Sequence, residues 1–388
     1  GRIRGRVAVV KGVASALTLS SGGSAGREGP MIQIGASLGS VIAQKGRLGE
    51  NGVRTLVAAG AAGGLAAAFN APIAGSLFAL EVVLGDFAIA SFSPVVMAGV
   101  AATVVSRGIY GPAQVFDIPQ YALVSALEFV PYVVLGVVAG IVAVVFTLFL
   151  YHQESAWERL PLPPWFKPAV GGLTVGVLAL AFPQILGIGH LAMDQMLEGQ
   201  VGLGLLLALV VMKIVATSLT LGSGGSGGVF VPSLFVGAAL GGAVGMAVSQ
   251  WAPFPHGGPG AYALVGMGAL VAATSHAPLT GIVIMFELTG DYEIILPVMV
   301  ACILSTVVAS SLKDESIYTQ KLKWKGISLR QGREENILRH LRVKDIARRE
   351  FQSFTEEASL TEVLAGAVGS SQTTFPLVTP ENEFIGVM

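Results

Sequence analysis

The first 312 residues consist of apolar runs with few charges between them, and this pattern most limits the folds open to the chain. Of its 23 basic and 24 acidic residues, 11 of each lie in the last 76 positions, from Lys313 onward. Long uncharged runs are typical of helices that cross a bilayer, where every backbone polar group must be satisfied internally. The run at 129–151 is long enough to span with some tilt, whereas many others are shorter. The sequence therefore predicts an all-α integral membrane protein followed by a short charged tail.

Composition excludes several classes of function. The net charge at pH 7 is −1, so no excess of positive charge is available to attract nucleic acid. Cys302 is the sole cysteine, which excludes a disulfide within the chain and a multi-cysteine metal cage. The 51 glycines allow helices to pack closely in lipid and to break around a cavity. We therefore expect no nucleic-acid partner, no metal and no cofactor in the apolar part, with the lipid bilayer as its surroundings.

One glutamate stands inside the apolar region, in the motif Gly26-Arg27-Glu28-Gly29-Pro30. A carboxylate in a membrane segment is costly and by default marks a functional site. The glycines allow close approach to a small ligand, and Pro30 suits the first turn of a helix. A helix N-terminus offers unpaired N–H groups and a partial positive charge, so it attracts anions. The motif predicts that the Glu28 carboxylate fills an anion site and leaves it when protonated, which makes it a gate. We expect Arg27 to be structural.

The second half of the chain repeats the first. Residues 30–39 align with 232–241 at an offset of 202, and residues 71–81 align with 277–287 at an offset of 206. Two matches at nearly one offset indicate a duplication. Paired, interrupted helices in two membrane repeats predict a central site where half-helix N-termini converge on an anion.

The second copy of the motif lacks a carboxylate. It reads Gly228-Val229-Phe230-Val231-Pro232 and follows a glycine-rich turn. We expect the N–H groups near Gly228, Val229 and Phe230 to hold an anion permanently at this helix end, because no side-chain anion competes for them.

The change in charge along the chain predicts three parts. Residues 1–312 form the transmembrane domain, with a first repeat at about 1–150 and a second at about 168–312. Residues 313–342 form a basic linker, which favours the cytoplasmic side. Residues 343–388 form the start of a small α/β module with a helix and two strands. The chain begins without an initiator methionine and ends inside a strand, so we expect further helices before it and more of the module after it.

The two motifs together resemble those of the CLC chloride channel and transporter family, which read G-[KR]-E-G-P and G-x-F-x-P. The segments FNAPIAGSLFALE and SHAPLTGIVIMFELTGDYEIILP are also similar, so the resemblance covers roughly residues 5 to 320. It implies two inverted repeats of broken helices and a homodimer in which each subunit has its own anion path. The tail from about Val343 more loosely resembles the first part of a cystathionine-β-synthase (CBS) repeat, which implies a possible adenine nucleotide ligand. A multi-pass protein of the plasma membrane with a cytoplasmic tail is expected.

The resemblance also implies roles for individual residues. Glu28 matches the external gating glutamate of the family. Val229 and Phe230 match the residues whose N–H groups bind a central chloride, and we add Gly29 and Gly228 to these expected donors. Tyr318 matches the tyrosine whose hydroxyl closes that site. Pro30 and Pro232 are expected to be structural.

Two departures from the family pattern bear on mechanism. The family's G-S-G-x-P motif would lie upstream of residue 1, so chloride or nitrate selectivity cannot be read. Exchangers usually carry an inner proton glutamate after the Asn-Ala-Pro segment, and alignment on that segment places Val82 there, with Glu81 beside it. Valine carries no proton. Glu81 and its repeat mate Glu287 are interpreted as structural, hydrogen-bonded acids, although Glu81 could also replace the missing proton acid.

We therefore favour passive, Glu28-gated chloride conduction over chloride/proton exchange. A proline at position 30 disfavours fluoride selectivity. An intramembrane enzyme with Glu28 as its acid would need a second reactive group, and none is evident, so we expect no enzymatic activity. A nucleotide sensor with an inert membrane anchor would leave the paired anion-type helix ends unexplained. Lys213, a lone charge in an apolar run, either pairs with an acid or gives positive potential to the anion path.

Overall fold

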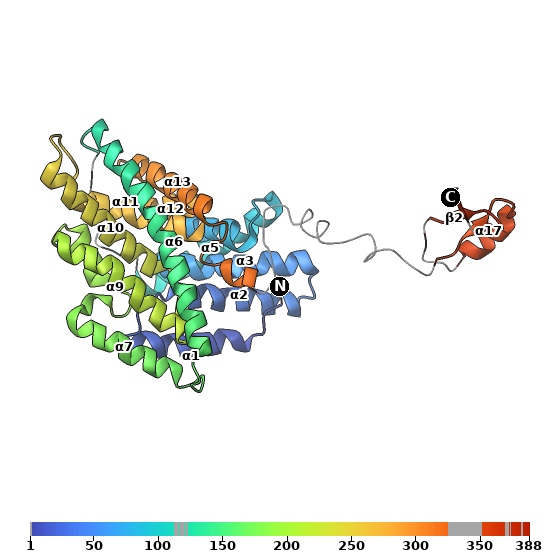
Figure 1. Ribbon diagram of the computed structural model, residues 1–388, viewed down its shortest axis with the longest axis horizontal. Helices are drawn as coiled ribbons and strands as arrows, with labels where there is room; N and C mark the ends of the chain where they lie inside the picture. Colours follow the sequence, from blue (N-terminus) through green and yellow to red (C-terminus); the bar gives the residue numbers. More distant parts are fainter. Residues whose placement is uncertain are drawn as a thin grey trace. The chain divides into compact units, whose positions relative to one another are not determined.

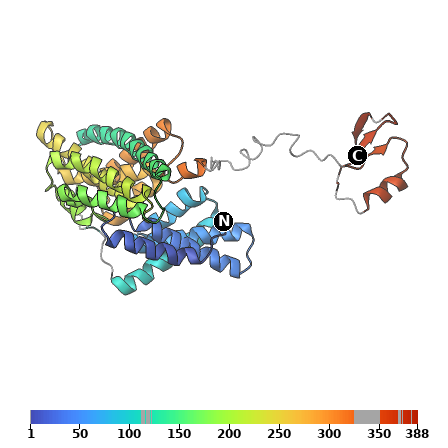
Figure 2. The ribbon, with the colours of Figure 1, turned by 60° about the horizontal axis from the view of Figure 1, so that its bottom comes forward.

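The computed structural model describes residues 2–111, 116, 121, 123–324, 351–368, 372, 374–381 and 383–388. These residues divide into two compact units, 1–327 and 328–388. The first unit is a body of packed helices, shown from two directions in Figures 1 and 2. Six of its helices are long and apolar enough to cross a membrane. The prediction of an all-α membrane domain followed by a small α/β segment is confirmed.

The elements of the first unit follow the duplicated sequence. The first half contains α1 (Arg6–Ser20), α2 (Glu28–Lys45), α3 (Glu50–Phe69), α4 (Pro72–Phe78) running into the π-helix η1 (Ala79–Leu84), and α5 (Ile89–Tyr110). The 3₁₀ turn η2 (Ala126–Glu128) leads into the long α6 (Phe129–Arg159). The second half contains α7 (Lys167–Ala181), η3 (Pro183–Ile185), α8 (His190–Leu197), α9 (Leu203–Gly222), α10 (Phe230–Trp251), α11 (Gly258–Ser275), α12 (Pro278–Thr289), α13 (Ile295–Leu312) and α14 (Gln320–Trp324).

The change of offset from 202 to 206 has a simple structural cause. Helix α2 has 18 residues and its counterpart α10 has 22. Both begin at equivalent positions, Glu28 and Phe230, so the four extra residues lengthen α10 by about one helical turn. From this point to the acids Glu81 and Glu287, equivalent residues are therefore 206 apart.

The equivalent helices also meet their neighbours in the same way. The helix pairs α2–α3 and α10–α11 each cross where two glycines face one another, Gly35 with Gly60 and Gly237 with Gly266. A Cβ added at Gly35 or Gly237 would overlap the facing backbone carbonyl, so a larger residue would force the helices apart. Such close crossings of small residues are a common way for helices to associate in lipid.

Contacts between the two halves are reciprocal. The Ser24 N–H donates to Thr220 Oγ1 at 3.1 Å, and the Ser226 N–H donates to Thr18 Oγ1 at 3.0 Å. Both members of each pair are shifted by 202 residues, so the same contact is made twice with the halves exchanged. Contacts of this isologous kind are the signature of a two-fold axis. The two repeats are therefore inverted copies related by a pseudo-two-fold axis.

The second unit is small and has its own sheet. Strand β1 (Phe354–Thr355) pairs parallel with β2 (Pro376–Val378), which pairs antiparallel with β3 (Phe384–Val387). Helix α17 (Leu360–Ala367) connects β1 to β2 and begins with a capping box between Ser359 and Glu362. Hydrogen bonds from the Ser359 N–H and hydroxyl hold the pKa of the Glu362 carboxyl below its ordinary value. The predicted helix and two strands are present. The short β1 was not expected, and residues 343–350 lie outside the described residues.

Candidate functional site

The two motif turns, far apart in sequence, pair directly with each other. The Gly26 N–H donates to the Gly228 carbonyl at 2.8 Å, and the Gly228 N–H donates to the Gly26 carbonyl at 2.7 Å. They form an isolated antiparallel bridge between the starts of α2 and α10. A Cβ added at Gly29 would lie 2.7 Å from the Gly228 Cα, so only glycine allows this approach. The structure thus brings both predicted helix N-termini to one place.

The bridge between the two turns removes one N–H group from the set that was expected to bind an anion. Because the Gly228 N–H already donates to Gly26, it is not free to bind an anion in this arrangement. Val229 and Phe230 lie one and two residues farther on, at the start of α10, where N–H groups lack partners within the helix. The expected donor set at this helix end therefore narrows to these two residues.

The Glu28 carboxylate lies in the space between the two turns. Glu28 is the first residue of α2, and its side chain is 1 % exposed. Its Oε2 atom occupies the space where a Cβ at Gly26 would lie, and it has no hydrogen-bond partner among the described residues. The δ-carbon of Pro232, in the first turn of α10, lies 3.3 Å from this same Cβ position at Gly26. It therefore fills a position at an opposing helix N-terminus that suits an anion.

Arg27 ties this turn to the neighbouring helix. One guanidinium nitrogen, Nη2, donates to the carbonyl of Ala68 near the end of α3 at 3.3 Å. The Nε atom lies 3.7 Å from Glu28 Oε1, while 43 % of the Arg27 side chain is exposed. These contacts fit a structural group that also partly balances the buried carboxylate. Pro30 and Pro232 are both buried in the first turns of their helices.

A cluster of four aromatic rings extends from Phe230, at the start of α10, to Tyr318. The ring of Phe230 lies 5.4 Å from that of Phe69 and 6.0 Å from that of Phe78. Phe78 also meets Tyr318 edge to face at 5.7 Å. The ring of Phe78 therefore lies between those of Phe230 and Tyr318. Phe78 was not among the expected site residues, although it lies between Asn-Ala-Pro and Glu81 in a segment that resembles the family.

Hydrogen bonds hold the segment that carries Tyr318 against helices of the first unit. The Ile317 N–H donates to the carbonyl of Thr274 at the end of α11, at 2.9 Å. The Ile317 carbonyl accepts a hydrogen bond from the Tyr151 hydroxyl of α6 at 2.6 Å. Residues 313–324, predicted as the beginning of a linker, therefore pack within the first unit.

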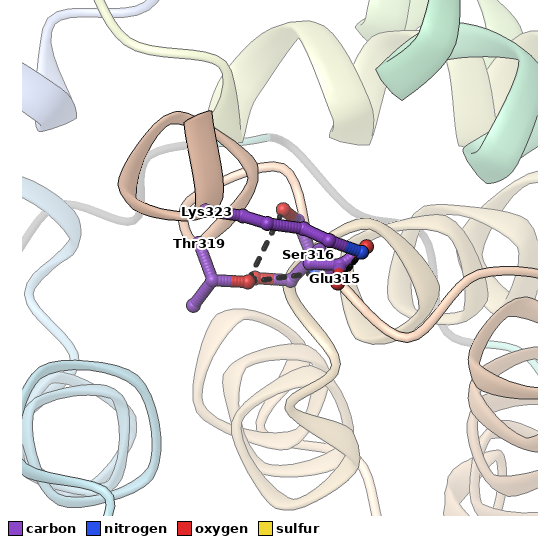
Figure 3. Close-up of polar contacts among 4 residues, drawn as sticks. All are labelled: Glu315, Ser316, Thr319 and Lys323. Carbon is purple, nitrogen blue, oxygen red and sulfur yellow. Dashed lines mark hydrogen bonds and ion pairs between the residues drawn. The ribbon is translucent and has the colours of Figure 1, made fainter. Parts of the chain in front are cut away.

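Local bonds hold this segment in shape, as Figure 3 shows. Lys323 forms an ion pair with Glu315. The hydroxyl groups of Ser316 and Thr319 lie 3.2 Å apart. The Tyr318 N–H donates to Ser316 Oγ at 3.3 Å. The turn before α14 thereby sets the direction from which Tyr318 approaches the other site residues.

Glu81 and Val82 lie in the π-helix η1. The Glu81 carboxylate accepts hydrogen bonds from the N–H groups of Leu279 (3.2 Å) and Thr280 (2.9 Å) and from the Thr280 hydroxyl (2.7 Å). It thus caps the N-terminus of α12. Val82 is partly buried against the apolar core. The Glu81 carboxylate is thus held by three hydrogen bonds, whereas the Val82 side chain has no titratable group.

Glu287 makes the symmetry-equivalent contact in the opposite direction, from the second repeat to the first. Its carboxylate accepts hydrogen bonds from the N–H groups of Ile73 (2.9 Å) and Ala74 (2.6 Å), at the start of α4. Glu81 and Glu287 are 206 residues apart, as are the N–H donors that each carboxylate meets in the opposite repeat. Each acid therefore caps a helix of the other half, which matches the structural role expected for both.

Lys213 is fully buried in α9 and has neutral partners. Its Nζ donates to the carbonyls of Ile185 and Gly187, each at 2.9 Å, and lies 4.8 Å from the ring centre of Phe235. Among the described residues no carboxylate lies within ion-pair distance of it. The alternative of an acidic partner is therefore not supported by these contacts.

Comparison with known proteins agrees with this architecture. A family model described as voltage gated chloride channel matches residues 1–310. A putative chloride channel protein ClcB-like from Ralstonia nicotianae is 37 % identical over 326 residues, which cover 83 % of this chain and 76 % of that protein. The voltage-gated ClC-type chloride channel ClcB of Escherichia coli K12 is 34 % identical over 313 residues, covering 80 % and 75 %.

Solved structures with similar folds are transporters. A slow cyanobacterial Cl⁻/H⁺ antiporter superposes with a TM-score of 0.74 at 30 % identity, covering 83 % of this chain and 77 % of that one. A CLC-type fluoride/proton antiporter superposes with a TM-score of 0.68 at 27 % identity, covering 79 % and 74 %. Together with the paired motif turns and the inverted repeats, these matches show that the chain belongs to the voltage gated chloride channel (CLC) family of membrane anion transport proteins.

Proposed function

We propose that this protein conducts chloride passively across the membrane, along a path that the Glu28 carboxylate closes. The position of that carboxylate carries the proposal. It is buried between the N-termini of α2 and α10, beside the Pro232 ring, with one oxygen unpartnered among the described residues. A chloride ion in the same place would meet the same N–H groups, so carboxylate and chloride compete. Protonation removes the charge that holds the side chain there, and the path opens.

The surroundings of Glu81 support passive conduction. The position at which the family resemblance places an inner proton carrier is Val82, which has no proton, and Glu81 lies beside it. Three hydrogen bonds from α12 already engage the Glu81 carboxylate, and protonation would remove the charge that strengthens them. A proton route through Glu81 would therefore weaken the cap of α12 at each cycle.

Chloride/proton exchange is the second candidate. It is favoured by the likeness to a slow cyanobacterial Cl⁻/H⁺ antiporter and by a titratable gate. The two candidates differ in one observable. An exchanger moves protons against their gradient when chloride flows, whereas a passive path does not.

The gate is tested by replacing Glu28 with glutamine. Glu28→Gln mimics the protonated side chain, so chloride efflux from liposomes should be faster near neutral pH and nearly independent of pH. Glu50→Gln, which removes an exposed acid from the start of α3, is the matched control and should behave as the wild type. If Glu28→Gln leaves both the flux and its pH dependence unchanged, Glu28 is not the gate.

We further propose that the protein is a transport protein rather than an enzyme and works as a homodimer in the plasma membrane, with its C-terminal tail in the cytoplasm. The family resemblance supports the dimer, and the basic residues after Lys313 support the orientation. The tail is proposed to be the first part of a CBS module that binds an adenine nucleotide. Mass measurement in detergent tests the dimer, and protease access to the tail from one side of sealed vesicles tests the orientation.

A further inference from the structure

A groove of about 830 Å³ runs along one face of α6, near the segment 313–324. It lies outside the group of residues formed by Glu28, Phe230 and Tyr318. One wall consists of α6 residues spaced three or four apart, from Val145 to Arg159, and the other includes Lys313 and Trp324. The chemistry of this groove changes along its length.

Its first half is apolar and open to the surroundings. Val145 and Leu148 are both 52 % exposed, and Phe149 lies beside them. These residues belong to the apolar run of α6, which ends at Tyr151 and is followed by polar positions from His152 onward. On a membrane-spanning helix, exposed aliphatic side chains in this place face the hydrocarbon of the bilayer.

Its second half is polar and basic. His152, Arg159 and Lys313 line it, and among the described residues no carboxylate lies within ion-pair distance of Arg159 or Lys313. Two nearby acids pair with other lysines, Glu154 with Lys321 and Glu315 with Lys323. Glu158 is exposed, and neither Glu158 nor Asp314 lines the groove. The polar half therefore offers two cations that have no ion pair within the described part of the chain.

Two further features mark this half as a binding surface at the membrane boundary. The buried Gln320 Oε1 has no hydrogen-bond partner among the described residues, and Gln320 lines the groove. Trp324 is half-exposed and meets Tyr151 edge to face at 5.2 Å. Tryptophan and tyrosine are enriched at the level of lipid headgroups. From Val145 to Arg159 the helix rises about 21 Å, enough for a headgroup and the upper part of an acyl chain.

We propose that this groove binds an anionic phospholipid. Its phosphate would lie between Arg159 and Lys313, and an acyl chain would follow Val145, Leu148 and Phe149. Basic pockets beside membrane helices are suited to anionic headgroups. The occupied groove would connect α6 to the segment that carries Tyr318, since Tyr151 of α6 already donates to the Ile317 carbonyl. Lipid binding would then steady the position of the Tyr318 hydroxyl.

Lipid binding is tested on the full chain in detergent, with phosphatidylglycerol as the probe and native mass spectrometry as the readout. The wild type should retain phosphatidylglycerol in preference to phosphatidylcholine. The double variant Arg159→Gln/Lys313→Gln should bind it roughly thirtyfold more weakly, as expected when two basic groups are removed from a headgroup site. The control Lys45→Gln/Arg54→Gln removes two basic residues from α2 and α3, outside the groove, and should bind as the wild type.

A second variant keeps every charge. Ala156 is exposed and lines the groove, so Ala156→Trp should fill it and displace the lipid while Arg159 and Lys313 remain. Equal retention by the wild type, the double variant and Ala156→Trp would overturn the proposal. An equal loss in the control pair would also overturn it, because binding would then follow total charge alone.

The effect on transport rests on the proposed chloride path and is measured separately. In liposomes with phosphatidylglycerol, chloride efflux should be faster than in liposomes of phosphatidylcholine alone, and Arg159→Gln/Lys313→Gln should abolish this difference. If the lipid is retained but has no effect on chloride efflux, the lipid site stands and its proposed effect on Tyr318 is refuted. Absence of chloride flux in every membrane, with retention intact, would refute the proposed function and leave the lipid site standing.

Discussion

The position of the Glu28 carboxylate depends on a residue that has no side chain. Its Oε2 atom occupies the space that a Cβ at Gly26 would need, beside the δ-carbon of Pro232 and the Gly228 carbonyl. The other atoms near that hypothetical Cβ lie at 3.3 and 3.4 Å, so a methyl group would fit once the carboxylate moved. A Cβ added at Gly29 would instead meet backbone atoms of the opposite turn, which cannot move aside as a side chain can.

Gly26→Ala should therefore act as a partly opened gate. The methyl group displaces the flexible carboxylate, so chloride efflux near neutral pH should rise several-fold, with little change in thermal stability. Gly29→Ala is the matched comparison. It places a Cβ 2.7 Å from the Gly228 Cα, so the two turns must separate and Tm should fall by several degrees. Wild-type flux and wild-type pH dependence in a folded Gly26→Ala protein would show that this contact does not hold the gate closed.

Tyr318→Phe tests the hydroxyl alone. The ring contact with Phe78 remains, whereas the O–H donor is lost. One neutral hydrogen bond contributes about 0.5–1.5 kcal/mol, so anion affinity should fall roughly two- to tenfold. Isothermal titration of chloride into the purified protein measures this change. An affinity equal to that of the wild type would mean that the hydroxyl does not contact the anion.

At the scale of elements, four helix N-termini are held by the opposite repeat. Helices α2 and α10 begin at the paired glycines, and α4 and α12 are capped by Glu287 and Glu81. The first repeat has one more residue than the second between its Ala-Pro and the next left-handed glycine, Gly85 or Gly290. The π-helix η1, which contains Val82, accommodates this extra residue.

The two caps should contribute similarly to stability. Glu81→Gln and Glu287→Gln each replace a charged acceptor, and loss of such a cap costs about 0.5–2 kcal/mol. For a large domain this corresponds to a fall in Tm of about 2–4 °C per kcal/mol. Thermal unfolding of the two variants in detergent should give similar shifts, with chloride flux retained. A Glu81→Gln variant that is as stable as the wild type but has altered proton movement would instead identify Glu81 as a proton carrier.

The sequence was sufficient to predict these helix ends, but not how they pair. The duplication, the motif helices and Glu28 at a helix start follow from local patterns. The exchange of caps between Glu81 and Glu287 is a long-range contact that no periodicity encodes. For the same reason, the N–H of Gly228 was expected to face an anion, although it bonds to Gly26. Phe78 was missed because a phenylalanine in an apolar run is equally typical of simple packing.

At the scale of the whole molecule, the inverted repeat brings the two motif turns together. The paired turns lie at the pseudo-two-fold axis, so residues 202 apart become neighbours. The carboxylate is present in one copy only, and on our proposal this asymmetry separates a gate at α2 from an anion-binding position at α10. Inverted repeats with broken helices are a common basis for transport at a central site.

The most direct test of this account records chloride efflux and external pH together, using full-length protein in chloride-loaded liposomes with an opposing proton gradient. We predict chloride flux that depends on pH through Glu28 and carries no coupled proton movement, because Val82 has no proton to carry and three hydrogen bonds engage Glu81. Protons moving against their gradient in a fixed ratio to chloride would contradict this account and show that the protein is an exchanger.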